Sequence, residues 1–523
     1  MRFFFSILLA SVSLAGIAQA STSGAYLAAR FAQDQGDWSA THKYIKEIMR
    51  DPDVGEAVQR RALVVAIAAE DYNQADLLAD ALLKTEEDKT LPLFYHAIRA
   101  VDAGENEKAL KTLEEIPDGG LAEISRPLLY TWLGPLDVRK TPKVSTLVLY
   151  HKILKAELDG KKDEIAMLAA QLPTDWPLSI RARNRLDAAL LRNDLKDVAQ
   201  KYDSTLADIS NQNQILSTFK PVQSVKEGVG FALFDIASML YNEQSAESTF
   251  IFLKLALMAE TEIPEAHLLL ATIEATRGRV SEAIAELKKI PSEYGLKEFV
   301  DIQRNIATLM FEAGAEREGV AILRDLGETH HDVDSLINLG DYFRNTERFE
   351  EALQCYEAAF RYFLDAVPQD YWYLYYYRGM TLERLGNWKR AEKDLLKALQ
   401  FKPDDPQILN YIGYSWADKG NNLDKAVSYL QRAVQLRPDD GYILDSLGWV
   451  YYRMKEWDKA VLWLEKAAQL MPYDATINDH LGDAYWKTGR KIEARFQWQR
   501  AMDNKPEEEA VPTIEEKLAA GLK

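Results

Sequence analysis

Hydrophobic positions recur at helical spacing along the chain, and no segment is rich in strand signals. In the C-terminal part a glycine recurs in phase with these positions. Gly379, Gly413, Gly448 and Gly482 lie 34, 35 and 34 residues apart. Alanines and prolines keep the same step: Ala391, Ala426, Ala460 and Ala494; Ala398, Ala433, Ala467 and Ala501; Pro403, Pro438, Pro472 and Pro506. A repeat of this length predicts an array of helix-turn-helix units.

Each repeat combines a small residue in its first helix with a bulky residue in its second, as with Gly448 and Leu464. Two antiparallel helices approach closely only where a side chain is small, and the bulky residue then fills the adjacent space. The proline that follows ends the second helix, because it has no amide donor and clashes with the preceding turn. The single 35-residue step coincides with Asn421 and Asn422, which predicts one extra residue in a loop and two intact helices.

The phased residues resemble the tetratricopeptide repeat, in which an apolar residue precedes Gly, an aromatic residue follows, and Ala, a bulky residue, Ala and Pro mark the second helix. The third copy, for example, carries Leu447, Gly448, Tyr451, Ala460 and Leu464. The resemblance implies an all-α fold, a right-handed superhelical solenoid of helical hairpins. A solenoid grows by stacking, so a long chain of this kind need not divide into compact domains.

The repeat pattern continues in phase towards the N-terminus, in copies whose residues match it less well. It is lost in one stretch, which several prolines interrupt. The predicted organisation is a signal peptide (residues 1–20), N-terminal repeats (21–117), divergent helical hairpins (118–229) with a long connection near 134–143, weaker repeats (230–371), four well-formed repeats (372–506), and a tail or capping helix (507–523).

The N-terminus has the form of an export signal. Arg2 precedes an apolar run over residues 3–16, and Ala18, Gln19 and Ala20 form a small-x-small cleavage site. The run is shorter than the roughly 20 residues that a membrane-spanning helix needs. We expect cleavage after Ala20, an uncleaved anchor being the alternative. No later segment has a transmembrane pattern, and a periplasmic location is predicted.

Composition and motifs argue against several classes of function. The net charge of −18 argues against a nucleic-acid binder, which needs concentrated Lys and Arg. Cys355 is the only cysteine, so an intramolecular disulfide and a cysteine-rich metal site are excluded, and a buried packing role is expected for it. The chain carries no metalloprotease, phosphate-loop or serine-hydrolase motif. We therefore expect no enzyme, no metal and no cofactor, unless a site lies unrecognised in residues 118–229.

A binding surface is the remaining source of function. The first helix of each repeat lines the concave side of such a solenoid, and positions two, five, nine and twelve of that helix face it. The candidate partner-binding residues at these positions are Tyr376, Asn410, Tyr414, Asp445, Trp449, Tyr452, Asp483 and Trp486. Aromatic side chains dominate many interfaces. The same rings could instead pack against the neighbouring repeat. A C-terminal carboxylate would be gripped by Lys at position five and Asn at position nine, and neither residue occurs at its position in the four copies. A free C-terminus is therefore a poor candidate ligand.

Over about residues 375–505 the sequence also resembles one proteobacterial envelope family of tetratricopeptide proteins. The resemblance rests on residues 409–414, 422–426, 444–450 and 480–483 and on Trp486. That family includes a lipoprotein adaptor that recruits and activates a carboxyl-terminal processing protease on cell-wall hydrolases. This chain has no Cys after its apolar N-terminal run, where such lipoproteins carry their lipid.

These observations predict a non-catalytic periplasmic scaffold that binds proteins along its concave surface. The resemblance implies a periplasmic protease or a cell-wall hydrolase as partner, with the scaffold presenting substrates to the protease. The alternative is a carbohydrate- or peptidoglycan-binding component of the envelope, in which the aromatic residues would stack on sugar rings.

Overall fold

The computed structural model describes residues 22–51, 54–85, 88–135, 145–173, 178–243, 245–291, 296–363 and 367–522. Within these ranges the chain forms 29 α-helices and short 3-10 helices, and it forms no strand. The predicted all-α fold of helical hairpins is confirmed. The predicted signal peptide and most of the connection near 134–143 lie outside the described residues. None of the described helices is both long enough and apolar enough to cross a membrane.

The chain divides into two units, Met1–Gly319 and Val320–Lys523, and the division falls within α18 (Glu316–Thr329). The helices of the first unit are α1 Thr22–Asp34, α2 Trp38–Ile48, α3 Glu56–Ala68, α4 Tyr72–Leu82, α5 Thr90–Asp102, α6 Asn106–Glu114, α7 Leu121–Leu133, α8 Thr146–Leu158, α9 Lys162–Ala169, α10 Ile180–Arg192, α11 Lys196–Tyr202, α12 Ile209–Thr218, α13 Val225–Asn242, α14 Ala246–Ala259, α15 Pro264–Thr276, α16 Val280–Leu287 and α17 Leu296–Glu312. Consecutive helices pair as hairpins through most of this unit, while α7 packs against both α8 and α13.

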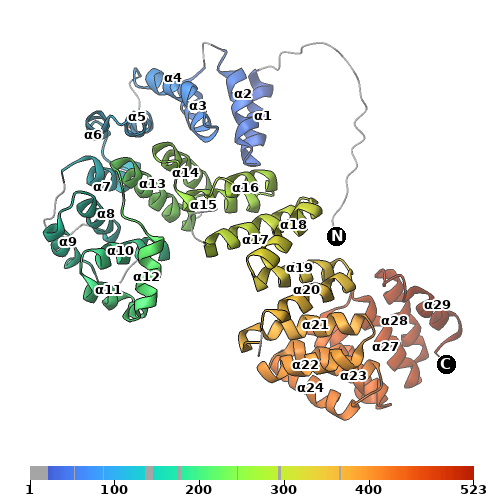
Figure 1. Cartoon of the computed structure of the whole chain (residues 1–523). Helices are drawn as coiled ribbons and strands as arrows, with labels where there is room; N and C mark the ends of the chain where they lie inside the picture. Colours follow the sequence, from blue (N-terminus) through green and yellow to red (C-terminus); the bar gives the residue numbers. More distant parts are fainter. Residues whose placement is uncertain are drawn as a thin grey trace. The chain divides into compact units, whose positions relative to one another are not determined.

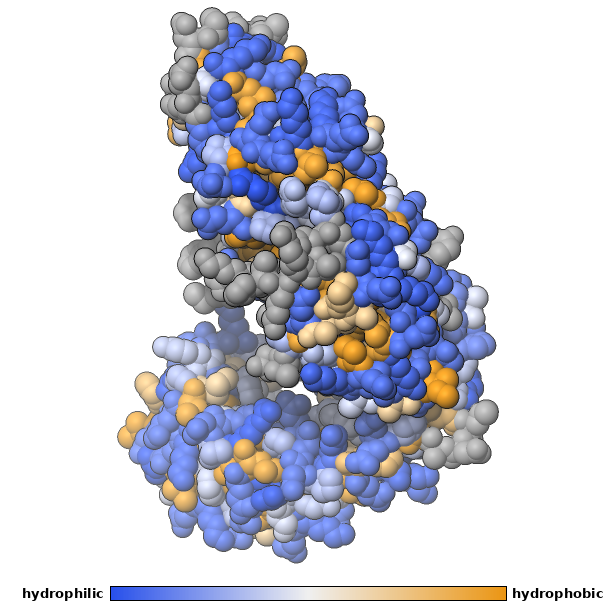
Figure 2. Space-filling view, turned by 90° about the vertical axis from the view of Figure 1, so that its left-hand side faces the viewer, coloured by the Kyte–Doolittle hydropathy of each residue, from blue (hydrophilic) through white to orange (hydrophobic). Residues whose placement is uncertain are grey.

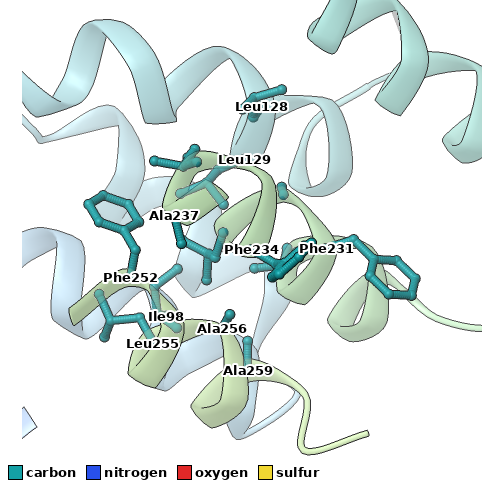
Figure 3. Packing of buried hydrophobic residues seen from close by; sticks show 14 of the residues in the cluster. Ile98, Leu128, Leu129, Phe231, Phe234, Ala237, Phe252, Leu255, Ala256 and Ala259 are labelled. Carbon is teal, nitrogen blue, oxygen red and sulfur yellow. The ribbon is translucent and has the colours of Figure 1, made fainter. Parts of the chain in front are cut away.

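The α13–α14 hairpin also packs against helices far from it in the sequence (Figure 1). Helix α14 contacts α3 and α5, and helix α13 contacts α7 and α8. Figure 3 shows the apolar residues that meet there, among them Ile98 on α5, Leu129 on α7, Phe234 on α13, and Phe252 and Ala256 on α14. Since α3, α5 and α8 are the first helices of their hairpins, the hairpin fills the side of the N-terminal array that a repeat protein usually leaves open.

Polar contacts accompany this long-range packing. Lys254 on α14 donates to Glu70, which follows α3, at 2.6 Å. Lys226 on α13 donates to Asp102 at the end of α5 at 3.1 Å. Further along, Arg185 on α10 donates to Glu265 on α15 at 2.9 Å, and both side chains are buried. Because a buried charge is costly unless it is paired, these contacts favour one register of the two surfaces.

The second unit is a regular stack. Its helices are α19 Val333–Asn345, α20 Phe349–Arg361, α21 Trp372–Arg384, α22 Trp388–Phe401, α23 Pro406–Asp418, α24 Leu423–Leu436, α25 Gly441–Arg453, α26 Trp457–Leu470, α27 Ala475–Lys487, α28 Lys491–Asp503 and α29 Val511–Ala520. Five hairpins, from α19–α20 to α27–α28, follow one another, and α29 packs against α28. The extra residue of the longer repeat lies in the loop before α24, where Asn422 has a positive φ of 48°.

The phased glycines lie where the two helices of a hairpin touch. A Cβ on Gly448 would lie 2.5 Å from Leu464 Cγ, and one on Gly413 would lie 2.6 Å from Leu430 Cγ. The last hairpin uses the same contact with a larger partner, since a Cβ on Gly482 would lie 2.5 Å from the indole of Trp498. The pairing of a small residue with a bulky one, which the sequence predicts, therefore sets the distance between the helices.

Aspartates in the loops between repeats start the first helices. Asp405 caps α23, Asp440 caps α25 and Asp474 caps α27, each accepting hydrogen bonds from backbone amides of the first turn. An N-cap of this kind contributes roughly 0.5 to 2 kcal/mol. The one cysteine, Cys355 on α20, is buried, and burial raises the pKa of its thiol to about 11, which fits the expected packing role.

In Figure 2 most of the visible face is hydrophilic, and the hydrophobic residues form separate groups. On this face, local hollows are therefore better candidates for binding sites than a large apolar area.

Gly228 on α13 provides a test of the long-range packing. A Cβ at this position would overlap the indole ring of Trp132 on α7, which is 1% exposed. We expect Gly228→Ala to lower the free energy of unfolding by about 1 to 3 kcal/mol. The exposed Ser248→Ala on the same hairpin is the control and should change it by less than about 0.5 kcal/mol. Equal chemical denaturation curves for the two variants would mean that α13 does not dock on α7.

Candidate functional site

The eight candidate residues all lie on first helices of the second unit. Tyr376 is on α21, Asn410 and Tyr414 are on α23, Asp445, Trp449 and Tyr452 are on α25, and Asp483 and Trp486 are on α27. The amide and the five aromatic side chains are half-buried, whereas the two carboxylates are buried, with exposed fractions of 6% for Asp445 and 4% for Asp483. The structure separates these residues into two groups with different surroundings.

The first group lies in a hollow of about 370 Å³ that four successive repeats enclose. Helix α19 contributes Arg344, helix α21 contributes Tyr376, Tyr377 and Met380, helix α23 contributes Gln407, Asn410 and Tyr411, and the start of α25 contributes Asp440, Tyr442 and Ile443. Of the eight candidate residues, only Tyr376 and Asn410 line this hollow.

Asn410 is the unusual polar group of the hollow. Its Oδ1 atom is buried and has no hydrogen-bond partner among the described residues. A buried acceptor without a partner typically costs about 1 to 3 kcal/mol, which a donor from a bound molecule would recover. The side chains of Gln407 and Tyr442 are exposed nearby, and the Tyr442 side chain is 55% exposed.

The aromatic wall of the hollow is held in place by its own contacts. Tyr376 meets Tyr411 edge to face with ring centroids 5.9 Å apart. Tyr411 also donates to Glu383 at 3.4 Å. Burial raises the pKa of the Tyr376 hydroxyl to about 12, so this hydroxyl stays protonated and can donate near neutral pH.

Arg344 is the only cationic side chain that lines the hollow among the described residues. It donates to Tyr356 at 3.3 Å and to Asp341 at 3.4 Å, and its guanidinium lies over the ring of Tyr377. Three partners within the protein therefore already engage this charge.

The second group of candidate residues is packed against neighbours from the same unit. Trp449 stacks on His480 with ring centroids 4.0 Å apart, and it stacks on Tyr452 at 4.8 Å. His480 lies on the next first helix and its Nδ1 is 3.0 Å from both carboxylate oxygens of Asp445. Asp445, Trp449 and Tyr452 therefore join two adjacent repeats. Tyr414, one repeat earlier, is half-buried, and burial raises its pKa to about 12.

Asp483 and Trp486 contact the C-terminal helices. Asp483 accepts from Trp498 Nε1 on α28 at 2.9 Å and from Lys517 Nζ on α29 at 2.9 Å. Trp486 packs against the ring of Trp498 and lies where a Cβ on Gly521 would be. These two residues hold the closing helix of the stack.

The hollow also contains residues outside the candidate set. Arg344 is at position twelve of α19, so counting the same positions one repeat further towards the N-terminus would have found it. Tyr377 and Tyr411 each follow a position-five residue, and Ile443 is at position three of α25, so position counting places them next to the concave face. Asp440 is also the N-cap of α25.

Comparisons with known proteins support the repeat assignment. Residues 337–406 and residues 441–474 each match a family model described as tetratricopeptide repeat. The second unit thus contains tetratricopeptide repeats over these residues. No curated protein matches the sequence significantly.

Several solved structures resemble parts of the chain. A tetratricopeptide repeat protein from Parabacteroides merdae ATCC 43184 is 17% identical, covering 48% of this chain and 96% of its own, with a TM-score of 0.39. A crystal structure of MamA protein is 22% identical, covering 36% and 96%, with a TM-score of 0.28. MamA from Desulfovibrio magneticus RS-1 is 20% identical, covering 33% and 94%, with a TM-score of 0.29.

The His480–Asp445 pair makes the stability of the second unit depend on pH. Burial by itself would lower the pKa of His480, but the neighbouring Asp445 carboxylate raises it above its ordinary value. The folded state therefore favours the protonated ring. The stabilisation is complete below the unfolded pKa of about 6.5 and is lost as the pH rises through the higher folded pKa.

We expect the denaturation midpoint of the second unit to fall as the pH rises above about 6.5, and His480→Gln to remove that part of the slope. Tryptophan fluorescence during urea unfolding would measure it. The exposed His331→Gln is the control and should keep the wild-type slope. Burial and the neighbouring Asp479 carboxylate also raise the pKa of Asp483, which separately lowers stability as the pH rises above about 4. A His480→Gln slope equal to that of the wild type would show that the pair is not ionised.

Proposed function

We propose that the protein is a non-catalytic scaffold that binds an extended segment of a partner protein in the hollow between α19 and α25. The observation that carries this proposal is the buried Oδ1 of Asn410, which has no partner among the described residues and lies in a hollow with several tyrosines in its lining. A backbone amide of a bound segment would supply the missing donor. Tetratricopeptide repeats are in general protein-binding arrays, which agrees with this use.

The chemistry of the hollow favours an internal segment over a free C-terminus. A terminal carboxylate needs a cation that is available to it, and Arg344 already has Asp341, Tyr356 and Tyr377 as partners. Asn410 and Gln407 offer neutral amides instead, and the tyrosines offer apolar surface. An extended chain with an apolar or aromatic side chain next to a free backbone amide fits these groups.

Carbohydrate or peptidoglycan binding is the rival proposal, and the surroundings of Trp449 weigh against it. Sugar recognition of this kind needs an open aromatic face, and the Trp449 ring already stacks on both His480 and Tyr452. In the hollow, the Tyr376 ring likewise contacts the rings of Tyr377 and Tyr411. Protein binding needs only their edges and the neighbouring amides.

The finer part of the proposal places this scaffold in the periplasm, where it presents substrates to a processing protease or binds a cell-wall hydrolase. Its support is the apolar N-terminal pattern of residues 1–20 and the resemblance of residues 375–505 to the envelope adaptor family. In this arrangement the scaffold holds one protein and leaves the catalysis to another.

Two tyrosine substitutions test the hollow as a binding site. Tyr442 lines it and is 55% exposed, whereas Tyr473 is 80% exposed and lies outside it. We expect Tyr442→Ala and Asn410→Ala to reduce recovery of a crosslinked partner from envelope extracts by about tenfold or more, because truncating an interface hot spot costs at least about 2 kcal/mol. Tyr473→Ala should recover the partner as the wild type does.

The same set of variants distinguishes protein binding from carbohydrate or peptidoglycan binding. Purified peptidoglycan that binds the wild type and loses binding in Tyr442→Ala, with no protein recovered by crosslinking, would support the carbohydrate proposal. Equal partner recovery by all four proteins would place the protein-binding site elsewhere on the chain.

Export has its own test in a Gram-negative host. We expect the protein in the periplasmic fraction with Ser21 as its first residue, as measured by mass spectrometry of the intact chain. Ala18→Arg should block cleavage, because the site needs a small residue there, whereas Gln19→Arg should leave cleavage unchanged. A full-length chain retained in the cytoplasm would contradict a periplasmic location.

A further inference from the structure

A second cavity lies in the first unit, away from the repeats discussed above. It has a volume of about 750 Å³ and is enclosed by α7, α13 and the first turns of α8 and α10. This volume is within the range of roughly 300 to 1,000 Å³ that is typical of small-molecule sites. Helices α7, α8 and α10 belong to the stretch whose repeat phase is lost, whereas the lining residues of α13 belong to the weaker repeats that follow it.

The walls of the cavity are mainly apolar. Leu128, Val148 and Leu178 are buried and line its inner part. Ile124 and Met239 also line it and are each 44% exposed, so apolar side chains reach from the interior to the solvent. A ligand with an apolar body would cover this surface and gain the free energy of its burial.

The charged groups that line the cavity all have the same sign. They are Glu123 and Asp235, and no Lys, Arg or His lines the cavity among the described residues. Glu123 is exposed, whereas Asp235 is only 5% exposed, and its Oδ2 has no hydrogen-bond partner among the described residues. A buried carboxylate oxygen without a donor is rare and costly.

The neighbours of Asp235 leave its charge uncompensated at the cavity. His151 Nε2 is 3.2 Å from Asp235 Oδ2, but His151 Nδ1 accepts a hydrogen bond from Trp132 Nε1 at 3.1 Å. Because an indole N–H can only donate, His151 Nδ1 carries no proton, and the proton of the neutral ring is on Nε2. His151 therefore offers Asp235 Oδ2 an N–H that is not aligned for a hydrogen bond, and it offers no positive charge. Arg185 also acts on Asp235 electrostatically, but it donates to Glu265 at 2.9 Å, and its charge is balanced there.

We propose that this cavity binds a small organic cation, an apolar body that carries a protonated amine, with the ammonium group at Asp235 and the body against Leu128, Val148 and Met239. The ammonium supplies the positive charge that the neighbours of the Asp235 carboxylate do not provide, and it can donate a well-aligned hydrogen bond to it. The apolar walls select an alkyl or aryl body, and the acidic lining rejects anions. This site is independent of protein binding in the second unit.

Matched ligands of one chain length test the proposal. Isothermal titration of the full chain with octylamine, octanol and octanoate at neutral pH should give the tightest binding for the amine. Octanol should bind at least about tenfold more weakly, because its hydroxyl brings no positive charge to the Asp235 carboxylate. Octanoate should show no binding.

Substitutions then separate the carboxylate from the cavity. Asp235→Asn should reduce octylamine affinity to about that of octanol and leave octanol binding unchanged, while Asp163→Asn, an exposed residue on α9 outside the cavity, should alter neither. Met239→Trp at the opening should weaken all binding. Equal affinities for the three ligands, no binding of octylamine, or an Asp235→Asn variant with wild-type selectivity would each overturn the proposal.

Discussion

The second unit depends on one steric constraint, the contact of a glycine with a bulky side chain across each hairpin. Gly448 faces Leu464 and Gly482 faces Trp498 at distances that leave no room for a methyl group. This contact fixes how far apart the two helices lie, and the next hairpin stacks on the surface that results. The aromatic hollow and the Asp445–His480 pair both lie between successive repeats, so their geometry follows from the same spacing.

The sequence predicts this part of the fold well because the contact is local and repeats. Gly448 and Leu464 are close in the chain, and their phase recurs in every copy. The partners of single side chains are harder to predict. Position counting places Asp445 and Asp483 on the concave side, but it cannot show that His480 comes from the next repeat or that Lys517 comes from α29. Both carboxylates are consequently buried, and the hollow that contains Asn410 lies further towards the N-terminus.

The first unit follows a different rule, which periodicity does not predict. Its α13–α14 hairpin packs against α3, α5, α7 and α8, and the contact is specified by shape and charge, as with Lys254 and Glu70. Neither the hairpin nor the helices that it packs against carry a sequence motif that identifies the other as its partner. The cavity at Asp235 arises in the same region, because α7 and α13 come together there with the first turns of α8 and α10. The more individual site thus forms where helices without repeat phase meet a helix of the weaker repeats.

The docked hairpin also has a consequence for the order in which the chain can fold during synthesis. Glu70 and Arg61 are made early, but Lys254 and Glu247, their partners on α14, follow 184 and 186 residues later. The N-terminal helices must therefore emerge from the ribosome and wait for α14 before their inner face is covered. Long-range contacts of this kind slow folding and leave apolar surface exposed meanwhile. The second unit, whose repeats contact their immediate neighbours, can fold one hairpin at a time as it emerges.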